Sequence, residues 1–248
     1  MSASTAKNSE AKRTPKTTQN TQQRGLLVIG AVVIVAVVAF IAIIALGNSS
    51  GSAIDYASIP QSRATDGAFI LGNPDAPITI IEFADFACPH CQAYHPTMQQ
   101  FIREFVATGK AKFEYRMLSY TGGAASRYSA QLLECANEQR EGAFWEGYSL
   151  MYQYATTARY NLDMARPMAQ ELDVSLSQLL ECSSSADQET IDMNFATNMN
   201  ITGTPATMVR YGDSQAQFIV FEGVTYDRGG ANYGALAGVV NLANIANQ

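Results

Sequence analysis

The stretch ITIIEFADFACPHC, residues 78–91, decides the fold. Its first six residues are apolar or β-branched apart from Glu82, a pattern typical of a buried strand, and the turn-like segment 72–77 introduces them. The motif CPHC (88–91) follows directly, and Pro89 suits the first position of a helix. The sequence therefore predicts a pair of cysteines at the junction between a strand and a helix.

That junction favours a reactive thiolate at the first cysteine. Unpaired N–H groups and the dipole at a helix N-terminus stabilise an anion, so the thiolate of Cys88 should be stabilised. His90, when protonated, adds a cation close by. Asp85 lies three residues before Cys88 and would raise the pKa of that thiol if its side chain faced the site.

A zinc site and a permanently closed structural disulfide are the alternatives for this cysteine pair. Zinc would require a second pair of ligands, and only Cys135, Cys182 and His95 remain besides His90. These residues show neither a second C-x-x-C nor the spacing of a histidine pair. We therefore expect no metal.

The chain continues as a strand–helix–strand unit. Apolar residues at helical spacing up to Gly109 predict the helix that follows the motif. Residues 112–118 predict a second strand, which completes a βαβ unit.

The second half of the chain is first helical and then mixed. Helical spacing runs to about residue 199, and strands are predicted at 206–211 and 217–221 before a last helix at 230–246. The predicted architecture is an α/β domain interrupted by a helical insertion. The domain comprises residues 65–121 and 200–248, and the insertion comprises 122–199.

Aromatic residues are frequent in the predicted insertion. Their helical spacing favours core packing over a substrate-binding surface for most of the following: Phe144, Trp145, Tyr148, Tyr152, Tyr154 and Tyr160. His95, on the helix after the motif, is expected to be solvated.

An apolar segment near the N-terminus predicts a membrane anchor. Leu26 to Leu46 contains no charged side chain and would span about 31 Å as a helix, which matches the hydrocarbon core. A cleaved signal peptide is the alternative, but its apolar region is usually about 7–15 residues long. We therefore expect residues 25–46 to form a single uncleaved transmembrane helix.

Charge and composition orient this anchor. Residues 1–24 contain five Lys or Arg and one Glu, a net charge of +4, and predict a disordered cytoplasmic tail. Residues 47–64 are rich in Ser, Gly and Ala and predict a flexible stalk. The expected location is the cell membrane, with the catalytic domain outside the cytoplasm, where disulfides persist.

The body of the chain is acidic. The whole chain has 16 Lys+Arg and 22 Asp+Glu, a net charge of −6, so the residues after the basic tail sum to −10. Nucleic-acid binding needs a basic face, so we expect no nucleic-acid partner.

The order of these features resembles the DsbA family of thiol-disulfide oxidoreductases. The resemblance rests on the strand, the motif 88–91, the helical stretch, and Gly203-Thr204-Pro205 before a hairpin and a final helix. It covers roughly residues 67–246. It implies a thioredoxin-like fold with an all-helical insertion, here preceded by a transmembrane helix.

The resemblance also implies roles for single residues. Cys88 would be the exposed nucleophile and Cys91 the buried resolving cysteine. Pro205, preceded by Thr204, would be a cis-proline that faces the disulfide and contacts substrate. Glu82 falls where the family has a buried acid beneath the disulfide, which suggests a proton relay to Cys91; the alternative is a surface carboxylate on an edge strand.

Cys135 and Cys182 both lie in helical stretches of the insertion. Outside the cytoplasm, and by similarity to DsbA-like proteins that carry one, we expect a structural disulfide between them. Two separate buried thiols are the alternative.

The expected function is that of a membrane-tethered oxidase. It would donate the Cys88–Cys91 disulfide to unfolded or reduced extracytoplasmic proteins, and a membrane quinone-linked protein would reoxidise it; no cofactor is expected. A disulfide reductase or isomerase is the nearest alternative, because family members of differing activity vary at the position of Thr204. A noncatalytic peptide-binding chaperone or assembly factor is the alternative from another class.

Overall fold

The computed structural model describes residues 53–247 of the chain. The predicted cytoplasmic tail (1–24) and transmembrane helix (25–46) lie outside these residues and stay predictions. Within residues 53–247, no helix is both long enough and apolar enough to cross a membrane.

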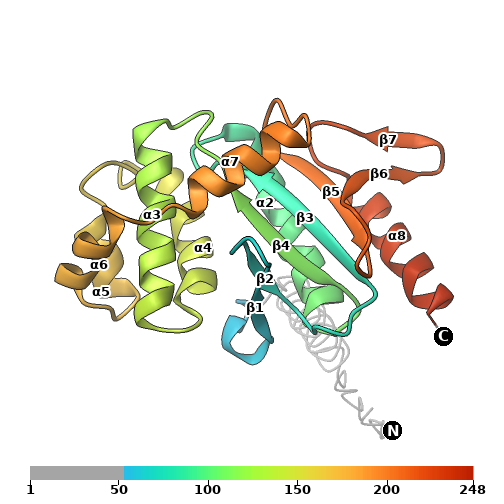
Figure 1. The fold of residues 1–248 in the computed structure, drawn as a ribbon, viewed down its shortest axis with the longest axis horizontal. Helices are drawn as coiled ribbons and strands as arrows, with labels where there is room; N and C mark the ends of the chain where they lie inside the picture. The colour runs from blue at the N-terminus through green and yellow to red at the C-terminus, as the bar shows by residue number, and fades with distance from the viewer. Residues whose placement is uncertain (1–52, 248) are drawn as a thin grey trace, which may run out of the picture. The chain divides into compact units, whose positions relative to one another are not determined.

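A seven-stranded sheet forms the centre of the molecule, in the order β1-β2-β4-β3-β5-β6-β7 (Figure 1). The central strand β3 (Ile78–Ala84) pairs in parallel with β4 (Lys112–Met117) and antiparallel with β5 (Ala206–Tyr211). All seven residues of β3 are buried, as its apolar composition predicts. The remaining strands are β1 (Gln61–Arg63), β2 (Phe69–Leu71), β6 (Gln217–Phe221) and β7 (Val224–Tyr226).

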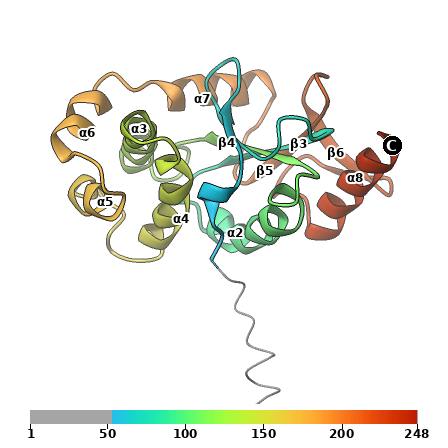
Figure 2. The same ribbon diagram turned by 90° about the horizontal axis from the view of Figure 1, so that it is seen from below.

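Helices cover both faces of this sheet (Figure 2). On one face lie α2 (Pro89–Phe101), which continues as a π-helical turn η2 (Ile102–Val106), and α8 (Tyr233–Ala246). On the other face lies α7 (Gln188–Asn198). We call these two sides the α2 face and the α7 face of the sheet.

The predicted helical insertion is confirmed, because every regular element between β4 and β5 is a helix. Four of its helices stand beside the sheet in Figure 1, and α7 leads back across it. The four are α3 (Ala124–Gln139), α4 (Ala143–Ala155), α5 (Ala165–Glu171) and α6 (Leu176–Ser183).

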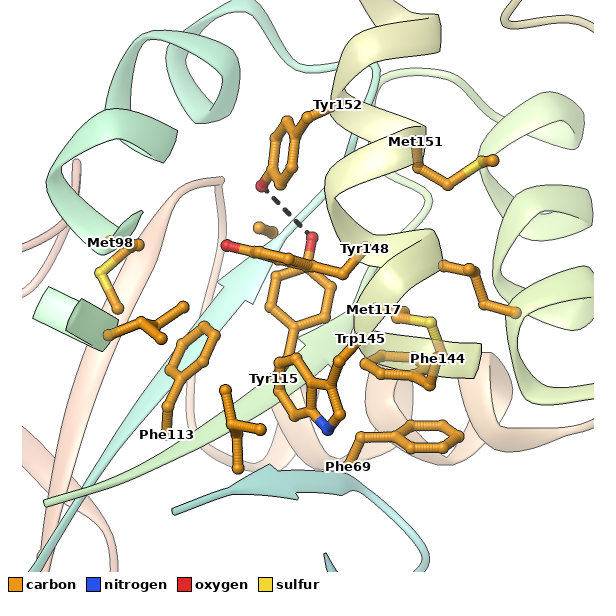
Figure 3. Close-up of a cluster of buried hydrophobic side chains, with 14 of the residues drawn as sticks. Phe69, Met98, Phe113, Tyr115, Met117, Phe144, Trp145, Tyr148, Met151 and Tyr152 are labelled. Atoms are coloured by element: carbon orange, nitrogen blue, oxygen red, sulfur yellow. Dashed lines mark hydrogen bonds between the residues drawn. The ribbon is translucent and has the colours of Figure 1, made fainter. Parts of the chain in front are cut away.

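The α2 face of the sheet and α4 share an aromatic core (Figure 3). Tyr115 of β4 packs edge-on against Tyr148 at 4.9 Å between ring centroids, and its hydroxyl lies 3.3 Å from that of Tyr152. Core packing is thus confirmed for five of the six aromatic residues for which the sequence predicts it; the sixth, Tyr160, is half-buried. At about 1 kcal/mol for an aromatic pair beyond the area it buries, such contacts fix the insertion to the sheet.

The predicted stalk (47–64) extends too far along the chain. A short 3-10 helix, η1 (Tyr56–Ser58), and β1 are ordered parts of the body, and the side chains of Tyr56 and Ile59 are buried. The Tyr56 hydroxyl accepts a hydrogen bond from Gln99 on α2 at 2.8 Å. The stalk prediction is therefore wrong for this part, because the Ser/Gly/Ala composition around these two apolar residues concealed them.

Candidate active site

The CPHC motif lies at the end of β3 and the beginning of α2. A turn closed by the hydrogen bond from the Cys88 N–H to the Asp85 carbonyl (2.9 Å) joins the two elements. Cys88 is the N-cap of α2, and Pro89 is its first residue, where the absence of an N–H has no cost. Both thiols, Cys88 and Cys91, are unpaired in this structure.

Cys88 is less exposed than the sequence predicts. Its side chain is 5% exposed and that of Cys91 is 0% exposed. The covering group is the segment Thr204-Pro205, whose peptide bond is cis. The Cys88 thiol donates a hydrogen bond to the Thr204 carbonyl oxygen at 3.4 Å, so a segment 116 residues away in the chain lies directly on the sulfur.

The environment lowers the pKa of the Cys88 thiol. Burial acts to raise it, but hydrogen bonds from the Thr204 side chain and from the backbone N–H groups of His90 and Cys91 stabilise the thiolate and have the larger combined effect. The N–H groups are those that the first turn of a helix leaves unpaired.

The environment of Cys91 has the opposite effect. Burial raises the pKa of its thiol well above the ordinary value, and the charge of Glu82 raises it further against a hydrogen bond from the Asp85 backbone. The two sulfurs of one motif thus differ in kind: Cys88 is suited to be a thiolate, and Cys91 is suited to hold its proton.

Glu82 is fully buried on the central strand β3, so the alternative of a surface carboxylate on an edge strand is wrong. Neither carboxylate oxygen has a hydrogen-bond partner. Burial raises its pKa to about 8, so the group is mostly protonated at pH 7.

Asp85 does not turn towards Cys88. Its carboxylate accepts hydrogen bonds from the N–H groups of Thr121 (2.6 Å) and Gly122 (3.0 Å), and from the hydroxyl of Ser126. These donors lie where β4 ends and α3 begins. Asp85 therefore does not face the Cys88 thiol, as it would have to in order to raise its pKa. It connects the motif to the beginning of the insertion by hydrogen bonds instead.

His90 is exposed at the rim of a groove beside the thiols. The groove has a volume of about 460 Å³ and runs between the first turns of α2 and the segment before β5. Its lining residues are His90, Ala93, Tyr94, Gly203, Thr204, Pro205, Arg228 and Gly229. The site therefore combines a cysteine pair with an open groove beside it.

Sequence reasoning missed the groove residues Tyr94 and Arg228. Tyr94 lies three residues after Cys91 on α2, and its hydroxyl donates to the Ala231 carbonyl at 2.5 Å. The consecutive Gly229 and Gly230, both with φ of +76°, were a turn signal in the sequence. Nothing in the sequence placed that turn next to the motif, because β5, β6 and β7 intervene.

His95 is not the solvated residue that the sequence predicts. Its ring stacks on Tyr152 at 4.0 Å between centroids, and its Nδ1 lies 3.2 Å from the Tyr148 hydroxyl. Burial lowers its pKa to about 4, so the ring is neutral at pH 7. It serves as a packing residue between α2 and α4.

The two remaining cysteines are joined in the insertion. Cys135 on α3 and Cys182 on α6 form a disulfide with a Cα–Cα distance of 5.8 Å. With Glu138 they make the one group of metal-ligating residue types among residues 53–247. Because both sulfurs are bonded to each other, this group offers no thiolate to a metal.

Comparison with known proteins identifies a family and several relatives. A family model described as "Thioredoxin" matches residues 64–215. Over 151 residues the chain is 25% identical to disulfide bond formation protein D of Bacillus subtilis, a match that covers 58% of this chain and 68% of that protein. A Na⁺/H⁺ antiporter, NhaA 3 of Salinispora tropica, is 28% identical over 148 residues, but the match spans 58% of this chain and only 22% of the antiporter.

The fold also has solved relatives. The crystal structure of Wolbachia pipientis alpha-DsbA1 superposes with a TM-score of 0.61 at 18% identity, and the match covers 75% of this chain and 97% of the relative. At this level of identity the likeness concerns the fold alone.

Proposed function

The chain belongs to the thioredoxin family and is a thiol-disulfide oxidoreductase of DsbA-like fold; from that premise we propose that it oxidises thiols of extracytoplasmic proteins. The observation that supports oxidation over reduction is that the pKa values of the two thiols are shifted in opposite directions. A stabilised Cys88 thiolate stabilises the reduced pair, and a stable reduced form makes the disulfide a strong oxidant.

The proposed reaction has two exchange steps. A substrate thiolate attacks the Cys88 sulfur of the Cys88–Cys91 disulfide, a substrate–Cys88 bond forms, and Cys91 leaves with the electron pair. A second substrate thiolate then attacks the substrate sulfur of that mixed disulfide, and Cys88 leaves as a thiolate. Two substrate thiols become one disulfide, and the enzyme pair gains two electrons.

Glu82 is the proposed proton donor to Cys91. The leaving Cys91 thiolate is strongly basic, and protonated Glu82 has a pKa of about 8, so transfer from the carboxyl to the sulfur is favourable. The unpartnered oxygens of Glu82 leave its proton available, since no other described residue holds it. The carboxylate would regain a proton before the next cycle.

Reoxidation requires an external acceptor. We propose a membrane quinone-linked protein for this role, as the family resemblance implies. The predicted helix 25–46, with its basic flank, would hold the enzyme beside such a partner on the outer side of the membrane. Protease added to intact cells without outer layers should then digest the body of the chain; full protection would contradict this topology.

The reduction potential of the full-length protein tests the direction. A potential well above the roughly −270 mV of thioredoxin is expected for an oxidase. In the same preparation, alkylation of reduced Cys88 should titrate below the free-thiol pKa of about 8.5, and Cys91 should react far more slowly. A thioredoxin-like potential together with an ordinary Cys88 titration would make the reductase the better account.

A noncatalytic peptide-binding function predicts a different result. Cys88→Ser removes the nucleophile and leaves the groove intact, so a chaperone or assembly factor would keep its function in this variant. The proposed oxidase would lose all disulfide transfer.

A further inference from the structure

The groove beside the cysteines carries a cation in an otherwise acidic body. Arg228 lines this groove with a side chain that is 88% exposed. Its one carboxylate partner within residues 53–247 is Asp227, whose Oδ1 lies 3.8 Å from the Arg228 Nε, at the limit for an ion pair. The guanidinium is therefore free to bind a carboxylate that a ligand brings, while the residues after the N-terminal tail carry a net charge of −10.

The loop that carries Arg228 is held in place on both sides. On the α2 side, the Tyr94 hydroxyl donates to the Ala231 carbonyl, and the Tyr94 ring lies so close to Gly230 that an added Cβ would come within 2.7 Å of it. On the β5 side, the Ala231 N–H donates to the Thr207 hydroxyl at 2.8 Å. The backbone next to Arg228 is thus anchored to α2, which carries Cys91, and to β5, which directly follows the segment Thr204-Pro205.

The opposite side of the groove leaves room for an extended chain. An added Cβ on Gly203 would meet no atom within 4 Å, and Thr204-Pro205 follows it with the carbonyl that lies on the Cys88 sulfur. A peptide whose cysteine reaches Cys88 would therefore pass along this side, and its neighbouring side chains would come next to Arg228.

We propose that Arg228 makes the groove selective for substrate segments that carry an Asp or Glu close to the reacting cysteine. The proposal rests on the proposed thiol exchange at Cys88. A carboxylate can accept two parallel hydrogen bonds from a guanidinium, which a neutral or basic side chain cannot do. Because the side chain is exposed, the effect is modest, about two- to fivefold, and it decreases with salt.

The test compares two cysteine peptides that differ only in charge. One carries Asp and the other Lys at the positions flanking the cysteine, and the second-order rate of exchange with the Cys88–Cys91 disulfide is measured for the full-length protein at low and high salt. The wild type should react faster with the Asp peptide, Arg228→Gln should lose the preference, and Arg228→Glu should reverse it. Arg166→Glu on α5 makes the same change of charge at an exposed site of the insertion and should keep the wild-type ratio.

The possible results distinguish failure of the proposed selectivity from failure of the proposed thiol exchange. Equal rates for the two peptides, or a preference that survives in Arg228→Glu, would overturn the selectivity while leaving the exchange reaction in place. Absence of exchange with every peptide would overturn the proposed function and the selectivity with it. A protein that proves to be a reductase would still show the ratio, because the same groove binds the peptide in both directions.

Discussion

The two faces of the central sheet hold buried carboxylates in opposite ways. On the α2 face, Glu82 of β3 is fully buried, and neither of its oxygens has a hydrogen-bond partner. On the α7 face, Glu114 of the neighbouring strand β4 is equally buried, but it accepts hydrogen bonds from Arg116 and Arg210, each at 2.7 Å. The Arg116 guanidinium is itself shared with Asp66 (2.7 Å) and Asp192 (3.1 Å).

This difference separates a charged carboxylate that helps to hold the fold together from a protonated carboxyl group that is available for chemistry. A buried charge is tolerated when hydrogen-bonded counter-charges surround it, and Glu114 on the α7 face satisfies that condition. A buried carboxyl without such partners keeps its proton instead, and its pKa rises towards neutrality, as for Glu82. The second arrangement costs stability at high pH, but it keeps a proton on a carboxyl group that is close enough to Cys91 to affect its pKa.

The largest expected effect is the pH dependence that Glu82 gives to folding. Its pKa is about 8 when folded and about 4.5 when unfolded, so above pH 4.5 the folded state binds more protons and the free energy of unfolding falls as pH rises. The contribution of Glu82 to stability is fully present below pH 4.5. It decreases as the pH rises to about 8, by up to about 5 kcal/mol in total. Urea unfolding across that range, followed by the fluorescence of the single Trp145, should show the decline.

Glu82→Gln is the matching control, because it removes the titration and keeps the shape of the side chain. A shallower decline should survive in this variant, since burial also raises the pKa of Asp192 on the α7 face, to about 7, against the effect of Arg116. An unchanged decline in Glu82→Gln would show that the unpartnered carboxyl is not its source.

Arg116→Met should have the next largest effect. It leaves Glu114, Asp192 and Asp66 without their shared cation, and removal of one partner from a buried ion pair costs about 3–5 kcal/mol. The measurement is the free energy of unfolding in urea at pH 7. A loss below about 1 kcal/mol would mean that the α7 face does not depend on its pairing.

Arg210→Met should be milder. Its side chain is 23% exposed, and Glu114 keeps the hydrogen bonds from Arg116 when it is removed. We expect a loss of about 1.5–3 kcal/mol in the same urea experiment, the usual range for a hydrogen bond to a charged group. A loss as large as that of Arg116→Met would indicate that the two arginines act as one unit.

Arg127→Met should have the smallest effect. The Arg127 side chain is 60% exposed and lies 3.3 Å from Glu189 on α7. Exposed ion pairs contribute about 0–1 kcal/mol, so this variant should unfold close to the wild type. A larger loss in the free energy of unfolding would show that this exposed ion pair belongs to the stabilising network of ion pairs on the α7 face.

The strong local patterns of the sequence predicted most of the sheet. The strands at 206–211 and 217–221 agree with β5 and β6 residue for residue, and Pro89 begins α2 as expected. The three-residue strands β1, β2 and β7 were missed, because three residues are too few to show an alternation. Their pairing depends on neighbours that are distant in the chain.

In the candidate site, too, the features that depend on local sequence were predicted and those that depend on long-range contacts were not. The cysteine pair and its place at a helix N-terminus are local facts of residues 78–91, so the sequence predicted them. The direction of the Asp85 side chain, the loop of Arg228 and the burial of His95 depend on which segments meet in space. On the α7 face, Glu114 and Arg116 alternate with apolar residues as in a strand with one solvated face, and only the position of α7 shows that this face is covered.

Asp85 has a consequence for exchanging parts between proteins of this architecture. One carboxylate, directly after the central strand ends, satisfies donors on both the cysteine loop and the first turns of the insertion, including Ala87, Thr121, Gly122 and Ser126. A chimera that receives a foreign insertion in place of residues 122–199 would lose Gly122 and Ser126, two of the four donors to this buried acceptor. Asp85, the segment 121–126 and the motif therefore form one transferable unit, and a graft should move them together.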